Sequence, residues 1–478
     1  MVRAEDDPRF DASLCLPPDA LDLLCISGGL LPSWVLLDSL AYMVPPGPGG
    51  VRNRTTAQTL LPDGRTIEVT FLIADPPRRS YWCISVCPAP DVAAHKEDEE
   101  EEDSPFDSIP KMVSSAGHLA LIKVGLTTCK HYLWLVYSAR GPPSLLLLPD
   151  IHEHQPLMEP YGIVPSSDSN SNNGCVVAAL SYNYEVDAQY DLHLLSYADS
   201  TWTCKRQHLP VDYGRTRKPY RIYPTKVIAL GDGVIGWVDL WEGILVCDVR
   251  ATDKAHFVPM PTPLPGNQHL YSKDYSSARP LRDVTFGHHG HMTMIRCVEM
   301  EQLLRPKPRA TPVVHDPSEL LLLFDSKSPM VPQKEEYEVV GWRLITWFRA
   351  LTWGHWQRGT LLCSDDLIGT RGNLAWEHLQ TCSPVLCATD KDAVYLMSML
   401  KNDQDKTAWI VTLDTRTKSL THEPMPFSAD RAPHDDPTHV PCALTTYLTS
   451  SSASGQEHAR VDAGTADLKG GTGDQGAT

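Results

Sequence analysis

Short apolar runs recur along most of this chain, and polar turn residues separate them. The clearest case is residues 233–249, where two runs rich in Val, Ile and Trp flank the turn Asp239–Gly243. This pattern predicts a β-hairpin, and we expect Gly243 to supply a positive φ at its turn. Because neither run offers a polar face, both strands are expected to lie inside a layered all-β body.

Other predicted strands form groups in which an apolar strand ends on Asp or a small polar residue. These groups recur at roughly fifty residues, which is the spacing of a four-stranded blade. The chain is therefore predicted to fold as a β-propeller-like body of about six four-stranded blades. A lone strand after Pro441 would complete the blade begun near Trp34, so that strands from both ends close the ring. Two packed β-sandwiches are the alternative, although they would leave more sheet edges unprotected.

Changes in composition suggest the domain organisation. Residues 1–31 are predicted to be an N-terminal arm and residues 32–449 a single propeller-like domain. An acidic loop over residues 88–112, which contains Glu97–Asp103, is expected to be solvated because its like charges repel. Residues 450–478 are rich in Ser, Gly, Ala and Asp, and they predict a disordered tail.

Several stretches carry a resemblance to a known family. Trp237–Asp239 and Gly243–Asp248 resemble the signature of domain of unknown function 1618 (DUF1618), a plant family much expanded in grasses. The resemblance extends from about residue 33 to about residue 449, with a family core at about 230–375. It implies no known activity, cofactor or catalytic residue. Further blocks fit the family in the same order: Ser33–Asp38, Ala41–Tyr42, Arg54–Ala57, Arg282–Val284, Ile295–Glu299 and Gly341–Trp347.

Charge and composition limit the classes of partner. The 478 residues have a hydrophobic share of 42%, which is enough for a substantial core, and a formal net charge of -17. That charge argues against nucleic acid or an anionic membrane as a partner, since phosphate binding depends on Lys and Arg. No apolar run reaches the length of a membrane span, and no basic segment followed by an apolar one begins the chain. We therefore expect an intracellular protein, cytoplasmic or nuclear, whose 13 scattered cysteines are mainly buried thiols.

Local motifs for catalysis are missing from the sequence. It contains no lysine-bearing phosphate loop, no Gly-x-Ser-x-Gly elbow and no His-Glu-x-x-His pair. Gly471–Gly476 has the spacing of a dinucleotide-binding loop, but neither a strand before it nor a helix after it is predicted. No cofactor is expected, and an enzyme is less favoured than a binding protein.

Three histidines, His288, His289 and His291, form the strongest metal candidate, because imidazole is a common ligand. No Cys or carboxylate with ligand spacing lies beside them, so an exposed turn is the favoured interpretation and no metal is predicted.

Aromatic and arginine residues concentrate in residues 342–358. Trp and Arg dominate binding hot spots, and Trp also stacks on sugars and cations. Packing between blades is the alternative role for these residues, and it is the favoured one. If a recognition surface exists, it is predicted here and at the loops around Trp241, with the candidates Trp241, Arg349, Trp353, His355, Trp356 and Arg358.

The leading hypothesis is a non-enzymatic scaffold that binds another protein through loops on one face. The alternatives are a hydrolase with its site in the central channel, and a module that binds a small molecule or glycan at Trp353–Trp356. A buried His or Asp with a strongly perturbed pKa in the channel would favour the enzyme. An exposed patch of Trp and Arg would favour the scaffold. The sequence does not predict the oligomeric state.

Overall fold

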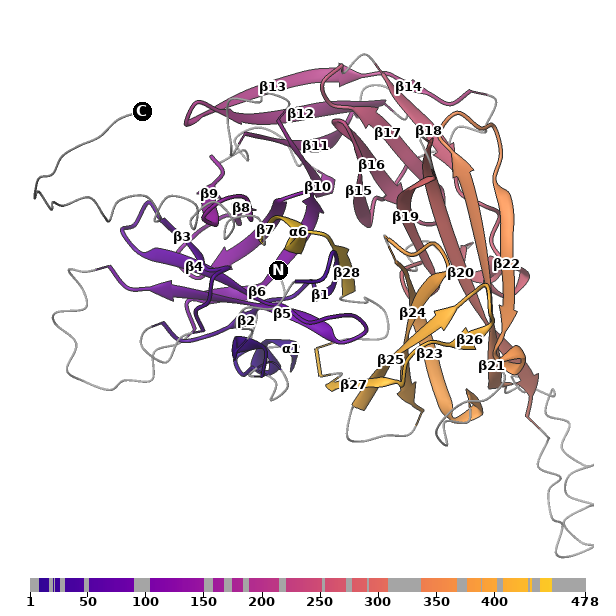
Figure 1. Cartoon of the computed structure of the whole chain (residues 1–478). Helices are drawn as coiled ribbons and strands as arrows, with labels where there is room; N and C mark the ends of the chain where they lie inside the picture. The colour runs from indigo at the N-terminus through magenta and orange to yellow at the C-terminus, as the bar shows by residue number, and fades with distance from the viewer. Residues whose placement is uncertain are drawn as a thin grey trace, which may run out of the picture.

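Six small sheets stand around a common axis and form a six-bladed β-propeller (Figure 1). The predicted all-β propeller is therefore confirmed. The computed structural model describes residues 8–16, 20, 22–25, 31–46, 51–89, 104–149, 158–166, 174–183, 189–214, 221–251, 254–271, 277–289, 292–307, 337–367, 376–387, 389–401, 407–428, 430–431 and 439–448.

The first blade joins strands from both ends of the described chain. β28 pairs antiparallel with β1, so that Val35 lies opposite Cys442 and Asp38 lies opposite His439. In Figure 1 the yellow β28 lies beside the indigo β1. The predicted closure of the ring is confirmed, and its physical effect is to pair two otherwise open edges. The strands of this blade are β1 (Val35–Asp38), β2 (Tyr42–Met43), β3 (Ala57–Leu60), β4 (Thr66–Leu72), β5 (Arg79–Cys87) and β28 (His439–Cys442).

The other five blades follow in chain order, and their consecutive strands pair antiparallel, apart from the first short strand of blade four, which pairs parallel with the last strand of that blade, and the last strand of blade six, which pairs with the third. Blade two contains β6 (Phe106–Ala116), β7 (Leu119–Leu126), β8 (Leu133–Ser138) and β9 (Ser144–Leu147). Blade three contains β10 (Met158–Pro165), β11 (Cys175–Asn183), β12 (Gln189–Ala198) and β13 (Thr201–Leu209). Blade four contains β14 (Val211–Asp212), β15 (Lys226–Gly231), β16 (Val234–Asp239), β17 (Gly243–Asp248) and β18 (Ala255–Pro259).

Blade five contains β19 (Arg282–His289), β20 (Met292–Pro306), β21 (Tyr337–Ala350) and β22 (Gln357–Cys363). Blade six contains β23 (Leu379–Leu386), β24 (Ala393–Leu400), β25 (Thr407–Asp414), β26 (Ser419–Leu420) and β27 (Met425–Ser428). Short helices connect or flank the blades: α1 (Pro8–Ala12), η2 (Asp22–Cys25), η3 (Pro265–Asn267), α4 (Gln268–Tyr271), η4 (Ser364–Asp366), η5 (Trp376–His378) and α6 (Thr445–Leu448).

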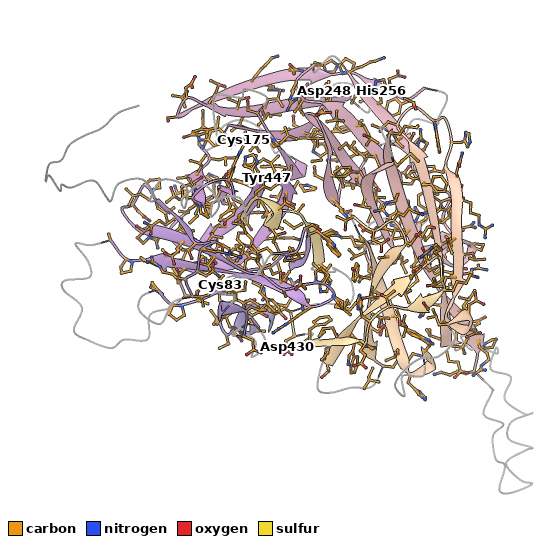
Figure 2. All side chains as sticks on the ribbon, viewed as in Figure 1. Cys83, Cys175, Asp248, His256, Asp430 and Tyr447 are labelled. Carbon is orange, nitrogen blue, oxygen red and sulfur yellow. The ribbon has the colours of Figure 1, made fainter. Side chains whose placement is uncertain are left out.

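Apolar side chains fill the spaces between neighbouring sheets (Figure 2). Trp82 of blade one and Tyr137 of blade two belong to one buried cluster, while Trp237 of blade four packs with Leu180 of blade three in another. Because each sheet is covered on both faces, its middle strands must be apolar throughout, which is why they are visible as apolar runs.

The central hairpin has the predicted turn, since Asp239 on β16 lies opposite Gly243 on β17. The expected role of Gly243 is wrong, because its φ lies outside the left-handed region. A Cβ at this position would overlap the Phe257 ring and lie 2.7 Å from the carbonyl oxygen of Val258. Glycine is therefore required by the close approach of β18, not by turn geometry.

Some predicted loops and strands differ from the structure, and other predicted segments fall outside the described residues. β6 begins at Phe106, so the loop expected over residues 88–112 is wrong in its last part. The strands β10 and β15 were likewise not predicted. The acidic run Glu97–Asp103, the strand expected over Leu320–Asp325 and the tail over residues 450–478 lie outside the described residues.

Candidate functional site

A cavity of about 800 Å³ lies along the propeller axis. Each blade contributes to its wall through its innermost strand: β28, β6, β10, β15, β19 and β23. This is the central channel. A volume of this size falls within the range of small-ligand pockets.

One carboxylate in the channel wall links three blades. Lys226 on β15 places its Nζ 2.6 Å from Oδ1 of Asp283 on β19 and also donates to the carbonyl of Val284. The second oxygen of Asp283 accepts the backbone N–H of Leu386 on β23, at 3.1 Å. The Asp283 and Lys226 side chains are only 10% and 17% exposed, so this charged pair is largely removed from water.

Arg282, the residue before Asp283, anchors the same strand to blade four. Its guanidinium donates to the carbonyls of Leu240 and Pro261 and pairs with Glu299 at 2.7 Å. Both charged side chains are fully buried. Glu299 also accepts from the Asn267 side chain, at 2.7 Å, and from the Leu264 backbone N–H, at 2.8 Å, so three donors face its charge. These bonds hold one side of the channel rigidly in place.

His439 on β28 lines the channel and is buried. Burial, together with the positive charge of Arg79, holds the pKa of this imidazole well below its usual value, so the ring is neutral at pH 7. Its ring packs edge-on to Phe427, with centroids 5.5 Å apart. A neutral imidazole can act as a base, but neither of these neighbours is a nucleophile that it could activate.

Burial raises the pKa of Asp239. Its carboxylate accepts backbone N–H groups from Tyr223, Trp241 and Glu242, at 2.7, 2.9 and 3.1 Å. These bonds close the β16–β17 turn. We therefore assign Asp239 a structural role, since these three backbone bonds already use most of the roughly four acceptor positions of a carboxylate.

A serine–histidine pair that sequence analysis did not find lies in blade three. Ser181 Oγ and His193 Nε2 are 2.9 Å apart, and burial lowers the pKa of His193. Asp191, on the same strand as His193, pairs with Arg206 at 2.6 Å. The pair resembles a base with its nucleophile, but Ser181 is only 1% exposed and is inaccessible to a substrate. Only the register of β11 with β12 brings these residues together.

The predicted binding residues separate into an inner and an outer set. Arg349 is buried, donates to the Trp353 carbonyl and places its guanidinium 5.7 Å from the centre of the Trp356 ring. Burial lowers the pKa of Arg349 from its usual value. Trp356 donates from Nε1 to the Pro259 carbonyl of blade four, at 2.6 Å. Trp241 packs against the same apolar cluster as Trp356.

The outer set lies on the turn that joins β21 to β22 and, in the case of Arg358, at the start of β22. Trp353 is half-buried, with its ring 6.3 Å from that of Phe348, while His355 and Arg358 are exposed. The structure thus brings Trp353, His355 and Arg358 onto one short surface segment, and it uses the inner set to hold that segment in place.

Metal ligation finds no support in the described ranges, which contain no cluster of three His, Cys, Asp or Glu side chains suited to an ion. His291 and the side chains of His288 and His289 lie outside the described part. Across the helices that the structure describes, none has the length and apolar character needed to cross a bilayer.

The fold and its channel define this protein as a six-bladed β-propeller. A family model described as "Protein of unknown function (DUF1618)" matches residues 237–395, which run from Trp237 on β16 to Tyr395 on β24. The chain therefore carries a DUF1618 family domain, and the predicted resemblance is confirmed over these residues. A comparison with curated proteins finds no match.

Proposed function

We propose that the protein is a non-enzymatic scaffold that binds another protein through the β21–β22 turn. The observation that carries this proposal is that some side chains hold this turn in place while others remain accessible to a partner. Arg349 and Trp356 fix it from below, while Trp353, His355 and Arg358 remain accessible.

A turn fixed in this way loses little conformational freedom when a partner binds, so more of the contact energy appears as affinity. Its accessible side chains also have the composition of binding hot spots, in which Trp and Arg predominate. The partner surface that fits them is an apolar pocket for Trp353 with an acidic rim for Arg358.

The test uses the full chain with a photo-crosslinking amino acid in place of His355, incubated in plant extract. We expect a single protein to be captured in near-stoichiometric amount and to be lost when Trp353→Ala is added. With the purified partner, Trp353→Ala should weaken binding at least tenfold. Trp353→Ala should leave the melting temperature nearly unchanged, whereas Trp356→Ala should lower it, because Trp356 joins two blades.

The matched control places the same crosslinker at Arg416, which is 73% exposed on blade six. Identical products from both positions, or no product from position 355, would contradict the scaffold.

One observation favours a second candidate, a hydrolase. His439 supplies the buried channel histidine with a lowered pKa that such an enzyme would need. Assays with ester, glycoside and phosphate-ester substrates test this hypothesis. An activity that is lost in a folded His439→Gln variant would favour the hydrolase over the scaffold. A glycan-binding module at Trp353–Trp356 is less favoured, since Trp356 is engaged by Pro259.

A further inference from the structure

Three polar side chains in the channel wall have hydrogen-bonding capacity that the described protein does not use. Ser114 on β6, Thr225 just before β15 and His439 on β28 all line the cavity. The Oγ of Ser114, the Oγ1 of Thr225 and the Nε2 of His439 are buried and have no hydrogen-bond partner among the described residues. These residues belong to blades two, four and one, whose innermost strands surround the channel (Figure 1). The unused polar groups are therefore distributed over three of the six blades.

An unpaired polar atom in a protein interior has an energetic cost that a ligand can remove. Burial strips such an atom of its water, and without a replacement partner the folded state is destabilised. A ligand oxygen in the channel supplies that partner. Ser and Thr hydroxyls turn about a single side-chain bond, so Ser114 and Thr225 can reorient toward a ligand without movement of the backbone. Their presence in the wall of a cavity therefore points to a bound molecule with hydrogen-bonding atoms.

The rest of the wall favours a ligand with a hydrocarbon body. Apolar atoms make up more of the channel surface than polar atoms do. Val227 and Ile228 of β15, Val385 of β23 and Val440 of β28 supply part of this apolar surface. A hydrocarbon body gains affinity when such a wall removes it from water, and the few polar groups in the wall fix its orientation.

Most of the charged groups of the wall are already engaged within the protein. Lys226 pairs with Asp283 at 2.6 Å, and the cations Lys111 and Arg279 have interactions of their own. Burial lowers the pKa of His439, so its ring adds no charge at pH 7. A charged ligand would have to compete with these existing partners, whereas a neutral one does not. The other ion pairs at the wall are Lys123–Glu159 and Arg282–Glu299.

We propose that the central channel binds a neutral small molecule with a mainly hydrocarbon body and one or more carbonyl or hydroxyl oxygens. Its oxygens accept hydrogen bonds from Ser114 and Thr225, and its body lies against Val227 and Val385. The cavity of about 800 Å³ is large enough for a molecule of this kind. This site is separate from the β21–β22 turn, so either proposal can fail without the other.

The experiment uses two neutral probes that differ in one group. Benzophenone has two phenyl rings joined by a carbonyl, and diphenylmethane has a methylene group in its place. Equilibrium dialysis against the full chain should show one saturable site for benzophenone. Diphenylmethane is the more hydrophobic of the two, so simple partition into an apolar space would favour it. We expect it to bind at least threefold more weakly, because it cannot accept a hydrogen bond. Citrate, the charged control, should not bind.

Ultraviolet light then locates the bound probe, since photoexcited benzophenone inserts into nearby C–H bonds and becomes a covalent label. Met112 and Val113 on β6 line the channel, whereas Met292 is 42% exposed and is not among the described lining residues. Mass spectrometry should find saturable label at Met112 or Val113 and little at Met292. Equal labelling of β6 and Met292 would show adsorption to the surface and would refute the channel site.

Ser114→Ala and Thr225→Val each remove one hydroxyl and should weaken benzophenone binding at least threefold, with little change for diphenylmethane. Ser144→Ala and Thr412→Val are the matched controls, because their hydroxyls also lack a partner in the described part of the chain and neither residue is among the described lining residues. Both should bind like the wild type, and equal weakening in the controls would overturn the proposal. Without ligand, Ser114→Ala should melt no lower than the wild type, since its hydroxyl has no bond to lose. A lower melting temperature would assign Ser114 a structural role instead.

The measurements on the wild type decide the proposal even if a channel variant does not fold. The absence of a saturable benzophenone site would refute the ligand site. Diphenylmethane binding that equals or exceeds benzophenone binding would refute the role of the channel hydroxyls.

Discussion

Lys226 of blade four and Asp283 of blade five form an ion pair at 2.6 Å across the joint between two inner strands. The other oxygen of Asp283 accepts a backbone N–H from blade six. One side chain therefore connects three blades at the wall of the channel.

Asp283→Ala should destabilise the fold by about 2–4 kcal/mol, because it removes the carboxylate that pairs with the Lys226 ammonium and accepts the Leu386 N–H. Urea unfolding measures this loss. In a double-mutant cycle with Lys226→Met, the two substitutions should couple by about 1 kcal/mol or more. Strict additivity would show that the pair does not contribute.

The joint between blades six and one contains a second buried charge cluster. Asp38 pairs with Arg79 at 2.7 Å and with Arg431 at 3.6 Å, and all three side chains are at most 4% exposed. Asp38→Ala removes the carboxylate that two buried guanidiniums share and should cost about 3–5 kcal/mol. Arg431→Met keeps the Asp38–Arg79 pair and should cost clearly less in the same denaturation experiment. The reverse order would contradict this assignment.

Gly243→Ala should destabilise the protein by more than about 2 kcal/mol, because the added methyl group collides with Phe257 and the Val258 carbonyl. Gly354→Ala is the matched control, since a Cβ there has no atom within 4 Å. It should change stability by less than about 1 kcal/mol. Thermal unfolding compares the two. Adding Phe257→Leu should recover part of the loss at position 243, and no recovery would refute the steric cause.

Stability should fall as the pH drops below about 6.5, partly because of His439. Burial and Arg79 lower its pKa in the folded state, whereas the unfolded chain has the usual value of about 6.5. Between these two values the unfolded state binds the proton and the folded state does not, so each pH unit removes up to about 1.4 kcal/mol. The contribution is complete above pH 6.5.

Urea unfolding from pH 7.5 to 5.5 should show a shallower loss for His439→Leu than for the wild type. The comparison is needed because His118 and His193 also have lowered pKa values and contribute slopes of the same sign. Parallel pH profiles would show that His439 titrates normally in the folded protein.

Thiol labelling should distinguish buried from exposed cysteines. Burial raises the pKa of Cys83, Cys175 and Cys247 to about 12, so their thiolates are scarce and unreactive at pH 8. Cys83 and Cys175 are labelled within blades one and three in Figure 2. Cys204, which is exposed on β13, and the exposed Cys15 should react with N-ethylmaleimide before these buried thiols in the native protein. Mass spectrometry identifies the labelled sites, and native labelling of Cys247 as fast as Cys204 would contradict this burial.

The sequence predicted the middle strands but missed three of the six innermost strands, β6, β10 and β15. Middle strands such as β16 and β17 are covered on both faces, so nearly all of their residues must be apolar. An innermost strand has one edge toward the channel, and β6 accordingly carries Asp107, Lys111 and Ser114 among its apolar residues. Such a mixture of polar and apolar residues is typical of a loop. The channel that explains it is formed by all six blades together, so the sequence of one strand does not reveal it.

The composition and apolar pattern of the chain thus determined the propeller architecture, an approximate count of six blades and the pairing of its two ends, because burying strands on both faces constrains residue type locally. Tertiary structure alone decided the functional geometry. Asp283 and Leu386 lie 103 positions apart in the chain, yet the fold places them in hydrogen-bond contact. The fold likewise brings Trp356 to blade four, where its Nε1 donates to the Pro259 carbonyl, and leaves Trp353 beside Phe348. Such contacts depend on how the blades pack against one another. The spacing of apolar residues within one strand predicts that strand but not its contacts with other blades.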